Sequence, residues 1–213
     1  MPGIVHVVDD DALYRTALQR LLKAAGYRVL AYASAQQFLD LRPDENAKGC
    51  ILLDVRMPGL SGPELQGRLT ELGWALPIVF LTGHPDISIA VNALKAGAEN
   101  FLVKPVSSNQ LLQAIERAIA RREKERALKA GLEALRALLS TLTPRQLQVF
   151  ELIVQGKTNK QAARELGGSA RTIKAHRQAI MEKMKVQSIT QLAAIAERLG
   201  MFSPDKGSAQ ASE

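Results

Sequence analysis

Cysteine is almost absent from this sequence: Cys50 is the single cysteine among 213 residues, so no disulfide can form within the chain. The longest apolar runs, such as 4–8 and 78–81, are far shorter than the roughly 18 residues of a membrane-spanning helix. The N-terminus has neither the basic segment nor the long apolar segment of a secretory signal peptide. We therefore expect a cytoplasmic protein that does not engage a membrane, since a lone thiol fits a reducing compartment.

Excess charge is lacking from the first 120 residues, which carry 11 basic and 12 acidic side chains, whereas residues 121–213 carry 17 and 9. The net charge of +7 therefore comes from the second part of the chain. A basic segment joined to a nearly neutral one is typical of a nucleic-acid-binding module fused to a module with another task. An ordinary basic surface is the alternative.

Short apolar runs alternate with amphipathic segments over the first 120 residues. The runs are rich in Val, Ile, Leu or Phe, as in strands buried on both faces of a parallel sheet, and they cover 4–8, 28–32, 50–53, 77–81 and 100–103. The helix-like segments cover 12–25, 34–41, 62–72, 86–96 and 107–125. Strict alternation predicts an α/β doubly wound, flavodoxin-like fold with a five-stranded parallel sheet.

Polar side chains follow the ends of these strands, where the ligand of such a sheet binds. The first strand is followed by Asp9, Asp10 and Asp11, and the third by Asp54. Clustered carboxylates repel one another unless a cation neutralises them, and hard oxygen ligands favour Mg²⁺. The sequence therefore predicts an acidic metal site. A solvated turn is the alternative, in which Asp11 caps the following helix.

Asp54 is the carboxylate best placed to attack phosphorus, because it stands alone at the end of the central strand, before a loop that can leave it accessible. An aspartyl phosphate needs its negative charge balanced on several sides. Mg²⁺, the ammonium of Lys104 and the hydroxyl of Thr82 would balance it, since the last two follow the fifth and fourth strands. Without such a site, Thr82 and Lys104 would be ordinary strand-end residues.

This first segment resembles the receiver domain of two-component response regulators. The resemblance covers residues 4 to about 120 and rests on four motifs in the expected order: VVDD at 7–10, LDVRMPG at 53–59, LTG at 81–83 and KP at 104–105. It implies that a partner sensor histidine kinase phosphorylates Asp54. It also implies that the chain is not an enzyme beyond self-phosphorylation from small phosphodonors and slow autodephosphorylation.

The resemblance assigns further roles around the phosphoacceptor. It implies that Asp10, Asp54 and the backbone carbonyl of Arg56 bind Mg²⁺, with Asp9 in the outer shell of the metal.

The resemblance also implies moving parts. Thr82 would shift toward the phosphate, and Phe101 would turn inward as the switch aromatic, although an aromatic residue in a strand is otherwise a core residue. The sequence departs from the pattern at Val106, where an aromatic often follows Lys-Pro, and at Pro85. Both positions flank the segments expected to move.

Residues 121–141 predict a helical linker. The stretch 121–126 is almost entirely charged, and five leucines then follow at spacings of four, three, four and three, as in a two-heptad seam: Leu128, Leu132, Leu135, Leu139 and Leu142. One interpretation is a helix that continues the fifth helix and pairs in a dimer. The other is an amphipathic helix packed on its own domain, because two heptads are short for an independent coiled coil.

Residues 142–200 predict an all-α domain of four short helices. Thr143 and Thr158 open capping boxes, and Ser169 and Ser188 are expected to cap the last two helices. A Gly-Gly turn at 167–168 separates the second helix from the third. Two helices joined in this way form a helix-turn-helix, whose second helix can enter the major groove of DNA.

The second helix of this motif has a basic surface. Lys174, Ala175 and Gln178 point where base edges would lie, while cations on the rim are expected to contact phosphates. These rim cations include Lys157, Lys160, Arg164, Lys183 and Lys185. A protein-interaction module is the alternative for the whole bundle.

The second segment resembles the LuxR-type DNA-binding domain. The resemblance covers about 140–200 through LTPRQ at 142–146, GKTNKQAA at 156–163 and TIKAHR at 172–177, with departures at Gly168 and Arg171. It implies that the helix capped by Ser188 mediates dimerisation on DNA. The implied contacts are to bases from Lys174, Ala175 and Gln178 and to phosphates from Thr172, His176 and Arg177.

The two modules together resemble the FixJ and NarL group of response regulators. We expect a receiver at 1–120, the linker at 121–141, a helix-turn-helix domain at 142–200 and a disordered tail at 203–213. Phosphorylation would promote a homodimer that binds paired half-sites on double-stranded promoter DNA, with RNA polymerase as a further candidate partner. One alternative is a constitutive transcription factor whose receiver is a phosphate-independent interaction platform. A Mg²⁺-dependent phosphatase is less economical, because no general acid and no substrate cap are visible.

Overall fold

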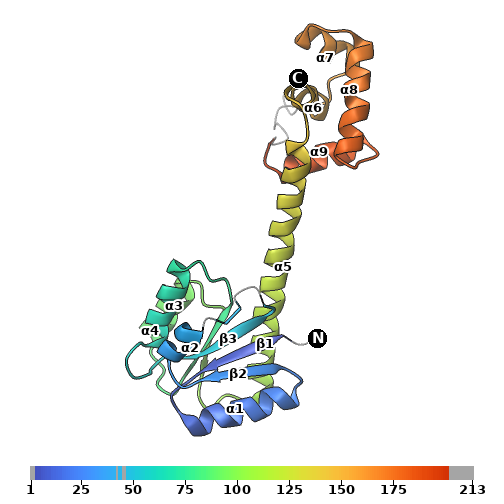
Figure 1. Ribbon diagram of the computed structural model, residues 1–213. Helices are drawn as coiled ribbons and strands as arrows, with labels where there is room; N and C mark the ends of the chain where they lie inside the picture. The colour runs from blue at the N-terminus through green and yellow to red at the C-terminus, as the bar shows by residue number, and fades with distance from the viewer. Residues whose placement is uncertain (1–2, 42, 45–46, 202–213) are drawn as a thin grey trace, which may run out of the picture. The chain divides into compact units, whose positions relative to one another are not determined.

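The structure is a computed structural model that describes residues 3–41, 43–44 and 47–201 (Figure 1). The chain divides into two compact units, Met1–Arg126 and Ala127–Glu213. The tail expected to be disordered, 203–213, lies outside the described residues. Among the described residues, no helix combines the length and the hydropathy needed to cross a membrane.

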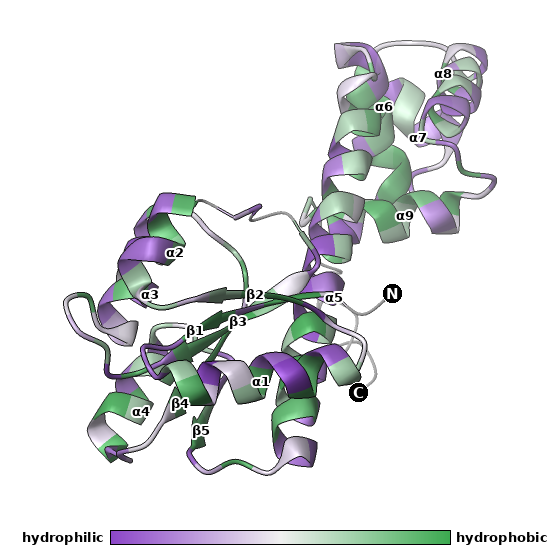
Figure 2. Ribbon diagram, turned by 60° about the horizontal axis from the view of Figure 1, so that its bottom comes forward, coloured by the Kyte–Doolittle hydropathy of each residue, from purple (hydrophilic) through white to green (hydrophobic). Residues whose placement is uncertain are grey.

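A five-stranded parallel sheet forms the centre of the first unit. Its strands are β1 (Ile4–Val8), β2 (Arg28–Tyr32), β3 (Gly49–Asp54), β4 (Ile78–Thr82) and β5 (Asn100–Val103), in the spatial order β2-β1-β3-β4-β5. The predicted doubly wound fold is therefore confirmed. Figure 2 shows hydrophobic residues along the central strands, as expected where helices cover both faces of a sheet.

Helices cover both faces of this sheet. The five helices that follow the strands are α1 (Ala12–Ala24), α2 (Ala35–Leu41), α3 (Gly62–Glu71), α4 (Ile87–Lys95) and α5 (Ser108–Ser140). One core cluster contains residues of α1 and the first part of α5. The other contains residues of α2, α3 and α4. Alternate residues of β1 belong to the two clusters, since Val7 packs in the first and Val8 in the second.

The second unit is a helical bundle. It contains the last part of α5 and the helices α6 (Pro144–Val154), α7 (Asn159–Leu166), α8 (Ala170–Lys183) and α9 (Ile189–Arg198). Thr143 and Thr158 form the predicted capping boxes, and Ser169 and Ser188 cap α8 and α9. Gly167 ends α7 in the left-handed conformation, with φ of 64°, which a residue without a side chain adopts readily.

The leucines of the expected seam have different environments. Leu135, Leu139 and Leu142 pack against the core of the second unit, whereas Leu128 is 52% exposed. Helix α5 runs without interruption through 121–140, all but the last residue of the stretch expected to be a linker. For these three leucines the structure favours the second interpretation, an amphipathic helix packed on its own domain, because the core of the second unit covers part of their apolar surface.

Candidate functional site

Three carboxylates meet at the carboxyl end of the sheet in the first unit. Asp9 and Asp54 are buried and Asp10 is exposed, and one oxygen from each lies within 4.8 Å of the others. The parallel pairing of β1 with β3 explains this meeting. Val8 lies opposite Leu53, and each of these two residues is followed in the chain by an aspartate. The donor set of three carboxylates fits a hard divalent cation such as Mg²⁺.

Lys104 neutralises part of this charge. Its Nζ atom lies 2.7 Å from Oδ2 of Asp9 and 3.0 Å from Oδ2 of Asp54, and it donates a hydrogen bond to each. Lys104 directly follows β5 at the edge of the sheet, and its side chain is 15% exposed. A single ammonium group therefore connects the two buried acids.

Burial and charge act in opposite directions on these groups. Burial raises the pKa of Asp54, and the hydrogen bond and charge of Lys104 offset this only in part. Burial alone would lower the pKa of Lys104, but the hydrogen bonds and charges of Asp9 and Asp54 outweigh it, so the pKa of Lys104 is raised. Lys104 is therefore a cation at neutral pH, held against a carboxylate whose negative charge is costly to bury.

The remaining oxygens of the cluster also have identifiable surroundings. Oδ1 of Asp9 accepts the backbone N–H of Asp11 at 2.9 Å. A backbone hydrogen bond from Arg56 lowers the pKa of Asp54 slightly against the effect of burial. Asp10 extends an exposed carboxylate toward solvent. The roles of Asp9, Asp10 and the carbonyl of Arg56 toward Mg²⁺ stay predictions.

Thr82 and Phe101 occupy the neighbouring strands. Thr82 is buried at the end of β4, and its hydroxyl accepts the backbone N–H of His84 and donates to the carbonyl of the same residue, both at 3.1 Å. Phe101 is partly buried and packs against the second core cluster, with its ring centroid 6.1 Å from that of Phe80. These contacts agree with a core role for Phe101, and its role as a switch stays a prediction.

Two residues of α1 contact the site and were missed by the sequence analysis. The ring centroid of Tyr14 lies 4.4 Å from Nζ of Lys104, and Nη1 of Arg15 donates a 2.6 Å hydrogen bond to the backbone oxygen of Asp9. The N-cap of α1 is Asp11, whose carboxylate accepts the N–H groups of Leu13 and Tyr14. Tyr14 and Arg15 follow the N-cap by three and four residues, which places them on the same face of the first turn of α1 as the cap. This spacing could have predicted that they lie near the site.

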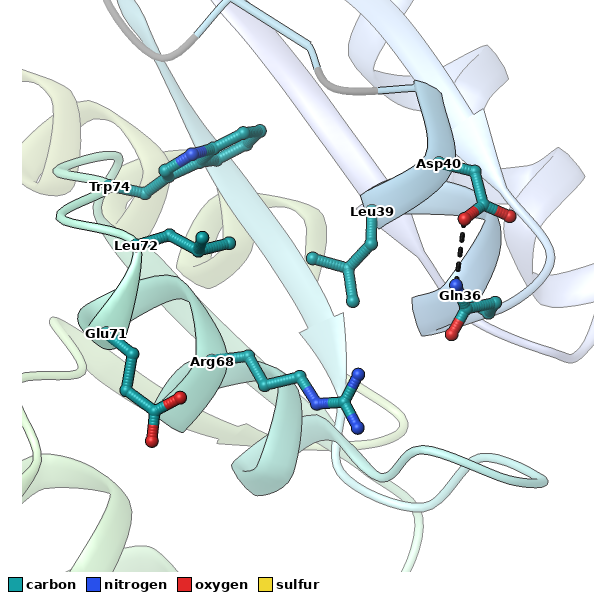
Figure 3. A pocket seen from close by; sticks show the side chains of 7 residues that line it. All are labelled: Gln36, Leu39, Asp40, Arg68, Glu71, Leu72 and Trp74. Atoms are coloured by element: carbon teal, nitrogen blue, oxygen red, sulfur yellow. Dashed lines mark hydrogen bonds between the residues drawn. The ribbon is translucent and has the colours of Figure 1, made fainter.

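A separate hollow of about 870 Å³ lies between α2 and the C-terminal part of α3. Figure 3 shows Leu39 of α2 facing Leu72 and Trp74 across the hollow, and the side chain of Arg68 extending from α3 toward α2. None of the clustered carboxylates lines it. Its size alone does not identify it as the functional site, since the charged groups suited to chemistry gather elsewhere.

Helix α8 presents the residues expected to contact nucleic acid. Thr172, Lys174, Ala175 and Gln178 are exposed, whereas Ile173, Ile180 and Met184 are buried in the core of the second unit. The exposed face therefore carries the side chains assigned to base edges and one assigned to phosphate. These contacts themselves stay predictions.

Two other residues assigned to phosphates are partly buried. His176 and Arg177 have intermediate exposure, and Nη1 of Arg177 donates a 2.7 Å hydrogen bond to the side-chain oxygen of Asn159 in α7. Arg177 thus links the two helices of the helix-turn-helix. No local sequence pattern predicts this link, because Asn159 lies 18 residues before Arg177.

Both units match known protein families. Residues 5–116 match the family described as response regulator receiver domain, and residues 140–196 match the family described as bacterial regulatory proteins, luxR family. The first match contains the acidic cluster, and the second contains α6, α7 and α8.

Several proteins resemble the chain over most of its length. Response regulator protein TmoT of Ectopseudomonas mendocina is 42% identical, over 92% of this chain and 89% of that protein. Transcriptional regulatory protein FixJ of Bradyrhizobium diazoefficiens is 41% identical, over 94% of this chain and 97% of that protein. The solved structure of response regulator StyR has a TM-score of 0.83 and 42% identity, and the similarity covers 92% of this chain and 98% of that one.

Proposed function

Because the chain belongs to the DNA-binding two-component response regulators that join a receiver domain to a LuxR-type domain, we propose that phosphorylation of Asp54 controls its binding to DNA. The phosphoryl donor is a partner sensor histidine kinase. Phosphorylation promotes a homodimer that binds paired half-sites in promoter DNA in the cytoplasm and affects transcription by RNA polymerase. The two functions belong to different parts of the chain, the receiver at 1–120 and the DNA-binding domain at 142–200, connected by 121–141.

The observation that carries this proposal is the pair of hydrogen bonds from Lys104 to Asp9 and Asp54. A carboxylate oxygen of Asp54 attacks the phosphorus of the donor, and the bond from phosphorus to the donor nitrogen breaks as the new oxygen–phosphorus bond forms. Lys104 then binds an oxygen of the transferred phosphoryl group. The negative charge of this oxygen replaces the charge that the Asp54 carboxylate has lost, so Lys104 remains paired with an anion. Thr82 donates its hydroxyl to another oxygen.

A divalent cation fits the same group of residues. Asp10, Asp54 and the backbone carbonyl of Arg56 would hold Mg²⁺, with Asp9 in its outer shell, and the ion would supply positive charge to the phosphoryl group. The site carries three carboxylates, because the exposed Asp10 lies beside the buried Asp9 and Asp54. Lys104 offsets only part of that charge.

Treatment with acetyl phosphate tests the assignment of Asp54. We expect the unmodified chain to gain one acid-labile phosphate, to dimerise and to bind DNA more tightly, whereas Asp54→Asn gains no phosphate. Asp40→Asn, which changes an exposed acid of the same unit, serves as the control and should behave as the unmodified chain. Phosphate retained by Asp54→Asn would contradict the assignment. DNA binding that is equally tight with and without phosphate would instead favour a constitutive transcription factor.

A further inference from the structure

Lys183 makes contacts that its place among the rim cations did not predict. It is the last residue of α8, and its Nζ atom lies 2.8 Å from the backbone oxygen of Thr141 and 2.8 Å from Oε1 of Gln146. The two acceptors precede Lys183 by 42 and 37 residues. One ammonium group therefore joins the end of α5, the start of α6 and the last turn of α8, all within the second unit.

Both oxygen atoms that accept hydrogen bonds from Lys183 lie at the ends of helices. Thr141 directly follows α5, where the last backbone carbonyls of the helix lack intrahelical partners. Gln146 is buried, and its Oε1 atom also accepts the backbone N–H of Thr143 as part of the capping box of α6. Two hydrogen bonds use both acceptor sites of this amide oxygen. Removal of the ammonium leaves a buried acceptor and a helix-end carbonyl without this donor.

The side chain of Lys183 lies on a different side of α8 from the exposed face that carries Gln178. Lys183 lies five residues after Gln178, which places it about 140° around the helix axis from that side chain. Its charge at the end of α8 is also favourable for the helix dipole. Arg177 holds the middle of the same helix through Asn159, so Lys183 supplies a second, independent attachment near its C-terminal end.

We propose that Lys183 is a positioning residue of the DNA-binding domain, which holds α8 against the junction of α5 and α6 and does not bind a DNA phosphate. The inference rests on the proposed function only in taking α8 as the helix that enters the major groove. A helix that reads base edges must be held in one orientation by its surroundings, because small displacements misplace its side chains. The loss of Lys183 therefore weakens recognition of sequence more than attraction to DNA in general.

Binding by the full chain after acetyl phosphate treatment tests this proposal. The probes are a duplex enriched from a random-sequence pool by the unmodified chain and a scrambled duplex of the same length. We expect Lys183→Met to bind the enriched duplex about tenfold more weakly, with unchanged binding to the scrambled duplex and an unchanged salt slope. Lys183→Arg, which keeps a donor, should restore most of the affinity. Lys160→Met, which removes an exposed cation of α7, should weaken binding to both duplexes and reduce the salt slope by about one.

The outcomes separate this proposal from its rivals. Equal loss on both duplexes with a reduced salt slope would show that Lys183 binds a phosphate, and unchanged binding would show that it has no role; either result overturns the proposal. Failure to enrich any duplex would count against the proposed function. The thermal midpoint of the Gln146→Glu variant described below would then test the hydrogen bond between Lys183 and Gln146.

A second variant covers the case in which Lys183→Met fails to fold. Gln146→Glu keeps the capping box and offers Lys183 a carboxylate in place of an amide oxygen. It should raise the thermal midpoint of the second unit when Lys183 is present, and this gain should be lost in combination with the uncharged Lys183→Gln and become smaller at high salt. A gain that does not depend on residue 183 or on salt would overturn the proposal.

Discussion

At the scale of single residues, the charge of Asp54 has a cost that substitution can reveal. Burial raises the pKa of Asp54 even with Lys104 beside it. A carboxyl group whose pKa is raised on folding favours the folded state below its unfolded pKa and loses that contribution as the pH rises through its folded pKa. At neutral pH the ionised Asp54 therefore destabilises the receiver. The proposed phosphoryl transfer accounts for this cost, because it needs an ionised carboxylate as the nucleophile.

We accordingly expect Asp54→Asn to raise the free energy of unfolding of the receiver by about 1 kcal/mol at pH 7. Urea unfolding followed by the fluorescence of Trp74, the only tryptophan of the chain, measures this in the full-length protein. Asp40→Asn is the control, because Asp40 is exposed and its replacement should leave the unfolding midpoint nearly unchanged. A loss of stability in Asp54→Asn would contradict the expected cost of burying the charge.

His6 provides a pH dependence in the same unit. It is 1% exposed, its Nδ1 atom lies 3.0 Å from the hydroxyl of Tyr32, and burial lowers its pKa from 6.5 to about 4. A histidine with a lowered pKa stays neutral in the folded state while the unfolded chain takes up a proton. Its contribution to stability is therefore present above pH 6.5 and is lost as the pH falls toward 4.

The receiver should lose about 3 kcal/mol of stability over this window through His6 alone. Urea midpoints measured by Trp74 fluorescence at several pH values between 7 and about 4 test this expectation. His6→Gln, which can keep a hydrogen bond to Tyr32 but does not titrate, should show a flatter pH profile. Equal slopes for the two proteins would exclude His6 as the source.

At the scale of elements, the start of α3 is packed directly against the backbone of Asp54. A Cβ atom added at Gly62 would lie 2.2 Å from the backbone oxygen of Asp54 and 2.9 Å from the ring of Phe80. The first contact is with backbone, which cannot move aside without displacing the end of β3. Gly67, in the same helix, has open space at the corresponding position.

Gly62→Ala should therefore destabilise the receiver by about 2 kcal/mol and slow its phosphorylation by acetyl phosphate, because the end of β3 is displaced. Gly67→Ala should instead stabilise the receiver by about 0.5 to 1 kcal/mol, since alanine is the better helix former at an exposed position. Unfolding midpoints and phosphorylation rates of both variants check this pair. Similar effects at the two positions would contradict the close approach at Gly62.

Elements also show where sequence patterns were sufficient. Short apolar runs bounded by turn residues predicted the five strands to within one or two residues, and capping boxes at Thr143 and Thr158 predicted the starts of α6 and α7. These signals act over a few residues. The leucine pattern of 128–142 was ambiguous, because heptad spacing is the same for a helix that pairs in a dimer and for one that packs on its own domain.

At the scale of the whole molecule, charge is divided between the two parts of the chain. The near-neutral part contains the acidic cluster, and the basic part contains the helix-turn-helix. Some cations of the basic part have protein acceptors, as Arg177 and Lys183 do. Fewer of them are therefore free to neutralise DNA phosphates than the net charge suggests.

The affinity of the full chain for DNA should fall by about a hundredfold or more between 50 and 200 mM salt. Fluorescence anisotropy of a labelled duplex over a salt series measures the slope. Arg20→Gln, an exposed change in the first unit, should leave the slope unchanged, since the first 120 residues carry no excess of positive charge. A flat salt dependence would contradict the assignment of DNA binding to the basic part.

The sequence by itself determined the fold class, the helix caps and the family, because apolar periodicity, caps and motifs are local or ordered along the chain. It also indicated that Lys104 would meet Asp54, since parallel strands bring their carboxyl ends to one edge. Only the tertiary structure decided that Tyr14 lies over Lys104 and that Lys183 joins α5, α6 and α8. Such contacts depend on how separate elements pack, and a single hydrogen bond of about 1 kcal/mol leaves no pattern in the neighbouring residues.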